Sequence, residues 1–185
     1  MKLYLLLLGA EVPGRLVEQH DYFFGVADSL MELVPQIRAF WPQAGNSLHV
    51  DGWREVTKVD DCAVQIVAQN DERMASVSKL FFLNLGGYTG GKLEEQHYIV
   101  LTAQQSRTDA IQAAKRSIFF KTNTLKGIAT SHIDEKYGVD VDSIHQVDEI
   151  LSPEFKAKYR ILITDGTELP EDEIHLGYFK LDKLK

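Results

Sequence analysis

An internal repeat constrains this chain more than any other feature of its sequence. Residues 3–20 read LYLLLLGAEVPGRLVEQH and residues 80–97 read LFFLNLGGYTGGKLEEQH, so nine of 18 positions are identical at an offset of 77. Similarity at one fixed offset indicates a tandem duplication, because two units are too few for a solenoid. We therefore predict a first repeat unit at 1–79 and a second at 80–185, packed together as one body.

The repeat continues beyond this phrase, and its offset changes once. Residues 29–32 and 106–109 keep the offset of 77, and both fit a helix start at which a serine caps free backbone N–H groups. The phrase His-Val-Asp at 49–51 then matches His-Ile-Asp at 132–134, at an offset of 83. The second unit is therefore predicted to contain a longer loop before this phrase.

Hydrophobic periodicity predicts the elements within each unit. Short continuous apolar runs at 3–8 and 80–85 are typical of strands that are buried on both faces. A second strand and a helix with one apolar stripe follow in each copy, and Pro35 is expected to kink or shorten the first helix. Further extended segments are expected at residues 48–56, 63–68, 143–150 and 159–163, with an additional strand at 174–181.

This order of elements predicts an α+β fold. Each unit reads strand, strand, helix, strand, strand, which corresponds to a mostly antiparallel sheet with one helix packed on it. The duplication predicts that the two units are related by a pseudo-twofold axis. The terminal apolar run is expected to add one strand to the second unit.

Composition and charge exclude several classes of protein. The chain is 44% hydrophobic and 25% charged, as in ordinary globular proteins. Its net charge of −7 disfavours nucleic acid and anionic membranes as partners. A single cysteine, Cys62, cannot form an internal disulfide, which favours the cytoplasm. The apolar run at 3–8 is too short for a secretion signal and recurs inside the chain, so we expect it to be a strand.

Polar residues that recur in both copies are the candidate binding residues. They are Glu18, Gln19, His20, His49 and Asp51 in the first copy, and Glu95, Gln96, His97, His132 and Asp134 in the second. Residues two apart in a strand project to the same side, so these pairs can present an acid and a base, or metal ligands. Carboxylate and imidazole together suit Zn²⁺, Mn²⁺ or Fe²⁺. The alternative is structural, with these side chains tying a loop to the sheet through backbone hydrogen bonds.

Three further motifs indicate structure more than function. Residues 86–92 fit the opening of a phosphate-binding loop, but Leu93 replaces the required Ser or Thr and a strand is predicted where a helix should follow. The acidic stretch at 134–149 lacks the spacing of a calcium-binding EF-hand, which favours a solvated loop. Cys62 has no basic neighbour in sequence, as expected of a buried, inert thiol.

Several phrases of the sequence carry a resemblance to a known family. GRLVEQHDYFF, PQIRAFWP, LFFLNLGGY, SHIDEKYGVDVD and IHLGYFKL resemble bacterial proteins grouped as domain of unknown function 1543. This domain occurs once or twice in a chain, so the resemblance implies two tandem copies here. The family has no assigned activity, and the resemblance therefore implies no catalytic residue.

Two functional hypotheses follow, and the sequence does not decide whether the protein is an enzyme. The first is a non-catalytic cytosolic protein that binds a small molecule or another protein, with a homodimer as one form. The alternative is a small-molecule enzyme, assisted by a divalent transition metal, that uses the repeated His and carboxylate pairs. A shared cleft at these pairs would favour the second hypothesis, whereas burial of each pair against its own backbone would favour a structural role.

Overall fold

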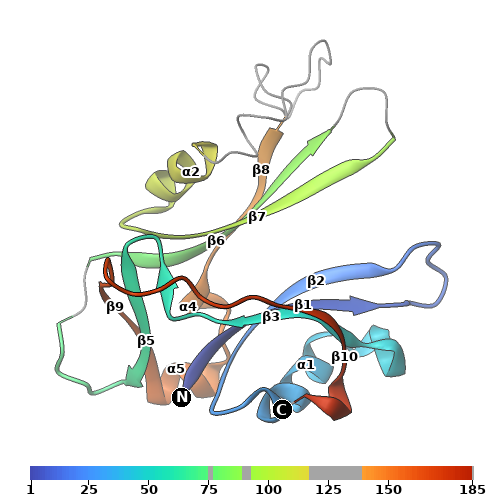
Figure 1. The fold of residues 1–185 in the computed structure, drawn as a ribbon, viewed down its shortest axis with the longest axis horizontal. Coiled ribbons are helices and arrows are strands. Elements are labelled where there is room, and N and C mark those ends of the chain that lie inside the picture. The colour runs from blue at the N-terminus through green and yellow to red at the C-terminus, as the bar shows by residue number, and fades with distance from the viewer. Residues whose placement is uncertain (75–76, 89–92, 117–138, 185) are drawn as a thin grey trace. The chain divides into compact units, whose positions relative to one another are not determined.

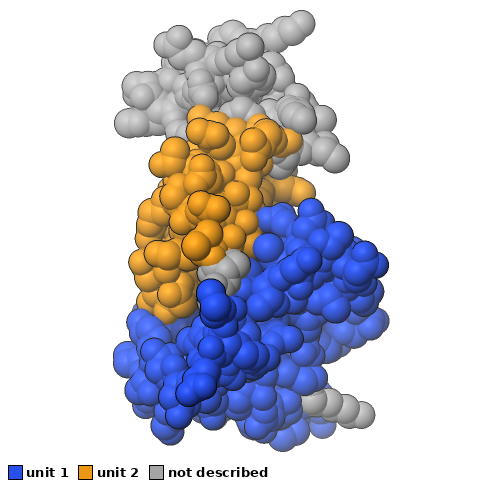
Figure 2. Space-filling model, turned by 90° about the vertical axis from the view of Figure 1, so that its left-hand side faces the viewer, with its two compact units in different colours: residues 1–74, 151–185 blue, residues 75–150 orange. Residues whose placement is uncertain are grey.

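The computed structural model describes residues 1–74, 77–88, 93–116 and 139–184, which divide into two compact units. The first unit contains residues 1–74 and 151–185, and the second contains residues 75–150 (Figure 2). The sequence predicted that residues 151–185 belong to the second repeat unit. In the structure they belong to the first compact unit. None of the helices in the described ranges is long and apolar enough to span a membrane.

A four-stranded antiparallel sheet forms the centre of the first unit (Figure 1). Its strand order is β10 (His175–Lys180), β3 (His49–Glu55), β1 (Lys2–Ala10) and β2 (Gln19–Ala27). The predicted apolar run at 3–8 lies inside β1, which has a neighbour on each side. The C-terminal strand β10 forms the edge beside β3 in this sheet.

One face of this sheet is covered by a short helical segment. It consists of the 3-10 turn η1 (Leu30–Leu33), the helix α1 (Val34–Phe40) and the 3-10 segment η2 (Pro42–Ser47). Pro35 lies in the first turn of α1, where its missing N–H costs no hydrogen bond, so it marks the start of the helix. The fully buried side chains of this core include Leu6, Leu8, Leu33, Ile37 and Val50.

A second, three-stranded sheet completes the first unit. Its order is β4 (Lys58–Val59), β5 (Cys62–Ala68) and β9 (Tyr159–Asp165), and α5 (Pro153–Lys158) leads directly into β9. The chain then returns through β10 to the turn η3 (Leu181–Lys183). The side chain of Asp172, 1% exposed, holds this return segment by accepting hydrogen bonds from the Thr57 and Lys58 amides at 3.0 and 3.1 Å.

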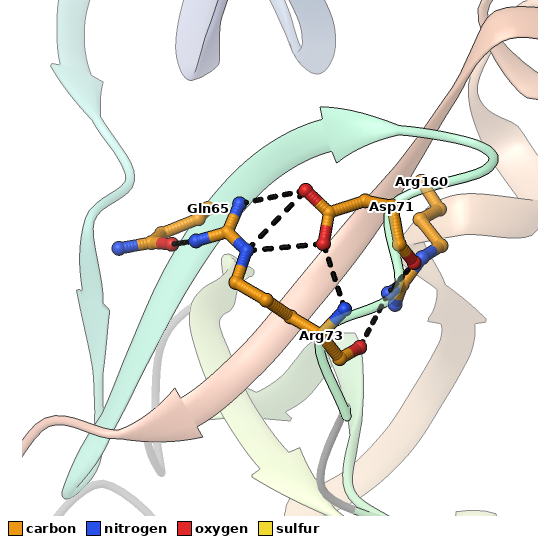
Figure 3. Close-up of polar contacts among 4 residues, drawn as sticks. All are labelled: Gln65, Asp71, Arg73 and Arg160. Atoms are coloured by element: carbon orange, nitrogen blue, oxygen red, sulfur yellow. Dashed lines mark hydrogen bonds and ion pairs between the residues drawn. The ribbon is translucent and has the colours of Figure 1, made fainter.

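The segment after β5 is fastened to β9 by two arginines (Figure 3). Arg160 donates from Nη2 to the backbone carbonyls of Asp71 and Arg73, at 3.0 and 2.8 Å. Arg73 in turn donates to both carboxylate oxygens of Asp71 and, at 3.0 Å, to Oε1 of Gln65. The bonds from Arg160 join two segments that are almost 90 residues apart in sequence, whereas those from Arg73 tie the segment after β5 to itself and to β5.

The second unit contains a three-stranded antiparallel sheet with the order β7 (Glu95–Gln104), β6 (Lys79–Tyr88) and β8 (Val139–Gln146). The helix α2 (Arg107–Lys115) packs on it, and α4 (Val147–Ile150) follows β8. The helix start predicted at Ser106 is confirmed, because its hydroxyl accepts from the Asp109 amide at 3.2 Å. At Ser29 the hydroxyl forms no such cap and instead donates to Glu32 at 3.2 Å.

The two hairpins at the start of the units share one register. Gly9 pairs with His20 in β1 and β2, and Gly86 pairs with His97 in β6 and β7. The third strand is bulged at the same point in both sheets, between Leu7 and Leu8 on β1 and between residues 84 and 85 on β6. The order strand, strand, helix is also the same in both units.

This pairing corrects the predicted match between the third strands. In β3, Asp51 is the extra residue at the bulge, and in β8 the extra residue is Asp142. Asp142 therefore takes the place of Asp51, at an offset of 91, whereas His132 and Asp134 lie outside the described residues. The repeated His-x-Asp phrase suggested a different match. The equivalent positions are set by pairing with the central strand of each sheet, and not by the local sequence.

Two other predictions about the second unit also need correction. The segment predicted as extended at 143–150 is a strand only to residue 146, because helix α4 begins at Val147. Within the acidic stretch at 134–149, residues 139–146 form β8, so this part is not a solvated loop. The mixed α and β class with antiparallel sheets is confirmed.

Candidate metal centre

The site in the first unit forms around a glycine in the central strand. Gly9 is the register partner of His20 in β2 and of His49 in β3, so the two histidines flank a residue without a side chain. A Cβ atom at Gly9 would lie 2.5 Å from Nε2 of His49 and would also collide with Oδ2 of Asp51. The glycine therefore provides the space in which these polar groups meet.

The bulge in β3 brings the acidic residue to the same place. Leu8 pairs with Val50 and Leu7 pairs with Gly52, which leaves Asp51 without a partner in β1. A bulge of this kind re-aims a side chain relative to the regular pleat. Val50 is fully buried in the core on the helix side, whereas Asp51 joins His49 in the polar cluster.

Four side chains from two segments, residues 18–20 and 49–51, converge there. Nε2 of His20 lies 3.1 Å from Oδ2 of Asp51 and 3.7 Å from Oε2 of Glu18. Nε2 of His49 lies 3.1 Å from Oδ1 of Asp51 and 3.3 Å from Oε1 of Glu18. Each carboxylate thus presents one oxygen to each imidazole, and we call these four residues the first cluster.

His49 is the most firmly held member of the first cluster. Its side chain is 4% exposed, and its Nδ1 lies 2.8 Å from the backbone carbonyl of Ser47. The ring of Tyr178, from β10, packs against the imidazole with the centroids 4.3 Å apart. Burial, one hydrogen bond and one aromatic contact therefore fix the direction of Nε2.

The hydrogen bond to Ser47 also determines what Nε2 can do. A carbonyl oxygen only accepts, so Nδ1 of His49 must carry the proton, and in the neutral ring the lone pair is then on Nε2. That lone pair faces two carboxylate oxygens, which are acceptors as well. The contact is favourable only if Nε2 binds a proton or if a cation lies between these groups. Histidines that bind metals usually donate their other N–H to a carbonyl or carboxylate in this way.

The contacts of the first cluster are pairwise, each between an imidazole nitrogen and a carboxylate oxygen. Ligand atoms about 2.1 Å from a zinc-like ion are separated by about 3.0 to 3.4 Å in octahedral or tetrahedral geometry. Three of the four nitrogen–oxygen distances, 3.1, 3.1 and 3.3 Å, fall in this range, and the fourth is 3.7 Å. Among the described residues, however, three ligand atoms that all lie within 4.8 Å of one another are found at Glu95, His97 and Asp142 and not in the first cluster, so its side chains would have to shift to share one ion. Oδ2 of Asp51 is buried and forms no aligned hydrogen bond with the described residues, despite its 3.1 Å approach to His20.

Gln19 and Gln96 are not part of such an arrangement. Nε2 of Gln19 donates to the carbonyl of Val17 at 3.0 Å, which ties the β1–β2 hairpin to itself, as the structural alternative predicts. Gln96 pairs with Gly87 in the β6–β7 hairpin. Neither glutamine side chain makes a contact with the histidines that the structure records.

A related cluster, which we call the second cluster, lies at the corresponding point of the second unit. Nε2 of His97 is 3.8 Å from Oε2 of Glu95, and its Nδ1 is 3.4 Å from Oδ2 of Asp142. One ligand atom from each of these residues lies within 4.8 Å of the others. Asn84, at the position of Leu7 in β1, donates from Nδ2 to Oδ2 of Asp142 at 3.3 Å and lies 3.2 Å from Nδ1 of His97.

Asp142 and Asn84 were missed as site residues, and each had a signal in the sequence. Asparagine at position 84 interrupts an otherwise apolar strand run, and a polar residue in such a run usually has a partner. The dipeptide Val-Asp occurs at 50–51 and again at 141–142, but only strand pairing shows that these two are equivalent.

The remaining motifs agree with their structural interpretations where they are described. The strand β7 follows the glycine-rich segment, so the helix that a phosphate-binding loop needs is absent at 95–104. Gly90, Gly91 and Lys92 lie outside the described residues. Cys62 is only partly buried, not fully buried as predicted. Desolvation nevertheless raises the pKa of its thiol, and neighbouring carboxylates raise it further, which suits an unreactive cysteine.

Comparisons with known proteins provide a fold and a domain name without an activity. The family model described as Domain of Unknown Function (DUF1543) matches residues 15–66, which include the whole first cluster. No curated protein matches the chain. The structure is similar to that of a solved protein, Il1583 from Idiomarina loihiensis, with a TM-score of 0.60, 22% sequence identity and 97% of each chain covered. At this identity the similarity shows the fold alone.

Proposed function

We propose that this protein binds a divalent transition-metal ion at the first cluster and uses it to act on a small molecule. The observation that carries the proposal is the position of His49 Nε2, which lies 3.3 and 3.1 Å from carboxylate oxygens of Glu18 and Asp51 while Nδ1 of the same ring lies 2.8 Å from the Ser47 carbonyl. A bound cation satisfies all of these acceptors at once. Two imidazoles and two carboxylates are a ligand set that Zn²⁺, Fe²⁺ and Mn²⁺ accept.

Exposure of the ligands supports a reactive ion more than a purely structural one. The side chain of His49 is 4% exposed, whereas those of Glu18 and His20 are 41% and 45% exposed. An ion held among them has one side against the sheet and one side toward solvent. Structural zinc sites are closed by protein ligands, and catalytic sites keep a position for water or substrate. The chemistry that fits is Lewis-acid polarisation of an oxygen atom on a small molecule.

A second candidate function, non-catalytic binding of a small molecule, is favoured by a different observation. The first unit contains a cavity of about 390 Å³, a size suited to a small ligand. Its lining includes the ion pair of Lys2 with Glu55 and the hydrogen-bonded pair of Gln65 with Arg73, but no member of the first cluster. This cavity and the first cluster can therefore be tested separately.

Metal content is the first test of the proposed function. Protein purified without a histidine tag is analysed for metals and then titrated with Zn²⁺ and Co²⁺ at neutral pH. We expect His20→Gln to weaken metal binding at the first cluster by about tenfold or more. Loss of a direct metal ligand should reduce affinity at least as much as loss of a residue that hydrogen-bonds to a ligand. His20 is half-exposed, so this variant is expected to fold. His145→Gln, a change at an exposed histidine of β8, is the matched control and should leave affinity unchanged.

The same samples decide whether the ion has an open position. Azide added to the Co²⁺-loaded protein should change its visible spectrum if solvent occupies a coordination site. A spectrum that azide leaves unchanged contradicts the catalytic role and leaves a closed, structural ion. Binding of less than about a tenth of an equivalent of Zn²⁺, Mn²⁺ or Fe²⁺ at neutral pH contradicts metal binding altogether.

A further inference from the structure

We infer that the second cluster is a metal site of different preference, which takes a harder ion such as Mn²⁺ than the first cluster does. Its described members are Glu95, His97 and Asp142, with Asn84 beside them. This inference extends metal binding to another part of the chain. It stands on its own observations and does not require the first cluster to bind.

The difference in preference follows from the atoms that each cluster offers. The first cluster provides two imidazole nitrogens, whereas the second provides one, from His97, together with the carboxylates of Glu95 and Asp142. At the register position of His49, β8 has Asp140 instead of a histidine. Imidazole suits Zn²⁺ and Fe²⁺, and oxygen donors suit Mn²⁺ and Mg²⁺. One nitrogen among several oxygens favours Mn²⁺ over Mg²⁺.

Asn84 is the independent observation that points to a ligand. Its Oδ1 atom is buried and has no hydrogen-bond partner among the described residues. A buried amide oxygen without a hydrogen-bond partner is unfavourable. In β1 the same position is occupied by Leu7, so a polar side chain is not needed to build this strand. The amide nitrogen of the same side chain contacts His97 and Asp142, so the amide oxygen lies within one side chain of the cluster and can accept from a metal-bound water if the amide turns.

The geometry of the second cluster is looser than that of the first. The distances from His97 to Glu95 and Asp142 are 3.8 and 3.4 Å, and they involve different ring nitrogens. All three ligand residues are exposed. Such a site leaves room for several waters around the ion, as Mn²⁺ and Mg²⁺ usually retain. Gly86 keeps this space open, because a Cβ there would lie 2.6 Å from Oδ1 of Asp142.

Sequential loading of the full chain tests the inference. The protein receives one equivalent of Zn²⁺ and is then titrated with Mn²⁺, with free Mn²⁺ followed by electron paramagnetic resonance. We expect about one Mn²⁺ per chain. Asp142→Asn and Glu95→Gln should each weaken Mn²⁺ binding by about tenfold or more without reducing Zn²⁺ binding. Glu94→Gln, one residue away from Glu95, is the matched control and should have no effect.

The His20→Gln variant, titrated with Mn²⁺ alone, separates the two clusters. The inference is supported if the His20→Gln variant still binds Mn²⁺ and the further change Asp142→Asn abolishes that binding. This holds even if the first cluster does not bind Zn²⁺. Loss of Mn²⁺ binding with His20→Gln places the ion at the first cluster and overturns the inference. The inference is also overturned if the wild-type chain binds no Mn²⁺, or if Asp142→Asn leaves its affinity unchanged.

Discussion

His20 and His49 lie on either side of one glycine in the sheet, although 28 residues separate them along the chain. Both are register partners of Gly9, one in β2 and the other in β3, and the side chains of Glu18 and Asp51 reach both imidazoles. Three adjacent segments of one rigid sheet therefore position all four groups. Sites built on strands hold their geometry better than sites built on loops.

A side chain at Gly9 should disrupt this arrangement. Its Cβ would lie 2.5 Å from Nε2 of His49, closer than real Cβ contacts allow, so Gly9→Ala must displace His49 or Asp51. We expect a loss of Zn²⁺ affinity of about tenfold or more, measured by calorimetric titration. Gly52→Ala is the comparison in the same sheet, because its Cβ would meet the exposed side chain of Leu176 at 2.9 Å and the His175 carbonyl oxygen at 3.3 Å, and neither belongs to the first cluster. Equal affinity in the Gly9 variant and the wild type would contradict the placement of the ion.

Tyr178 should support the first cluster through its ring and not through its hydroxyl. It packs on the imidazole of His49 at 4.3 Å, and such ring pairs contribute about 0.5 to 1.5 kcal/mol. Tyr178→Ala is therefore expected to weaken metal binding by about 2- to 10-fold, because His49 loses one of its constraints. Tyr178→Phe keeps the ring and should bind like the wild type. If the phenylalanine variant binds as weakly as the alanine variant, the hydroxyl is involved and this account is wrong.

Asp172 should be important for stability. It accepts from the backbone amides of Thr57 and Lys58 and, at 2.6 Å, from the Thr57 hydroxyl, and its side chain is 1% exposed. Asp172→Ala removes the charged acceptor of all these bonds and should lower the free energy of unfolding by about 1 to 3 kcal/mol in urea titrations. Glu171→Ala removes an 83% exposed partner of Lys58 and should change stability by less than about 0.5 kcal/mol. Similar losses for both variants would contradict this account of Asp172.

The stability that Asp71 contributes should depend on pH. Hydrogen bonds from the Arg73 side chain and amide hold the pKa of the Asp71 carboxyl below its ordinary value. A carboxyl with a lowered folded-state pKa stabilises the protein above its unfolded pKa of about 3.9, and this contribution is lost as pH falls further. The stability difference between the wild type and Asp71→Asn should therefore be present at neutral pH and shrink below about pH 4. Glu72→Gln, at the exposed neighbouring residue, should show no such trend in thermal unfolding.

Local patterns were sufficient to predict the secondary structure of much of the chain. Continuous apolar runs predicted β1 and β6, and the serine of a capping box predicted the start of α2. The repeated phrase Glu-Gln-His drew attention to Glu18 and His20, whose side chains lie 3.7 Å apart, whereas the glutamine between them bonds within its own hairpin. The interpretation of this repeat as a tandem duplication stays a prediction, supported by the shared register at Gly9 and Gly86.

Tertiary structure decided which residues meet. The bulges that bring Asp51 and Asp142 into their clusters depend on pairing with a central strand, and pairing is a long-range choice that periodicity does not encode. For the same reason residues 151–185, assigned by sequence to the second repeat, belong to the first compact unit, where β10 pairs with β3 and places Tyr178 against His49. The sequence alone determined the types of side chain available for a metal. Which of them lie together depends on strand neighbours, because those contacts form only when distant segments pack together.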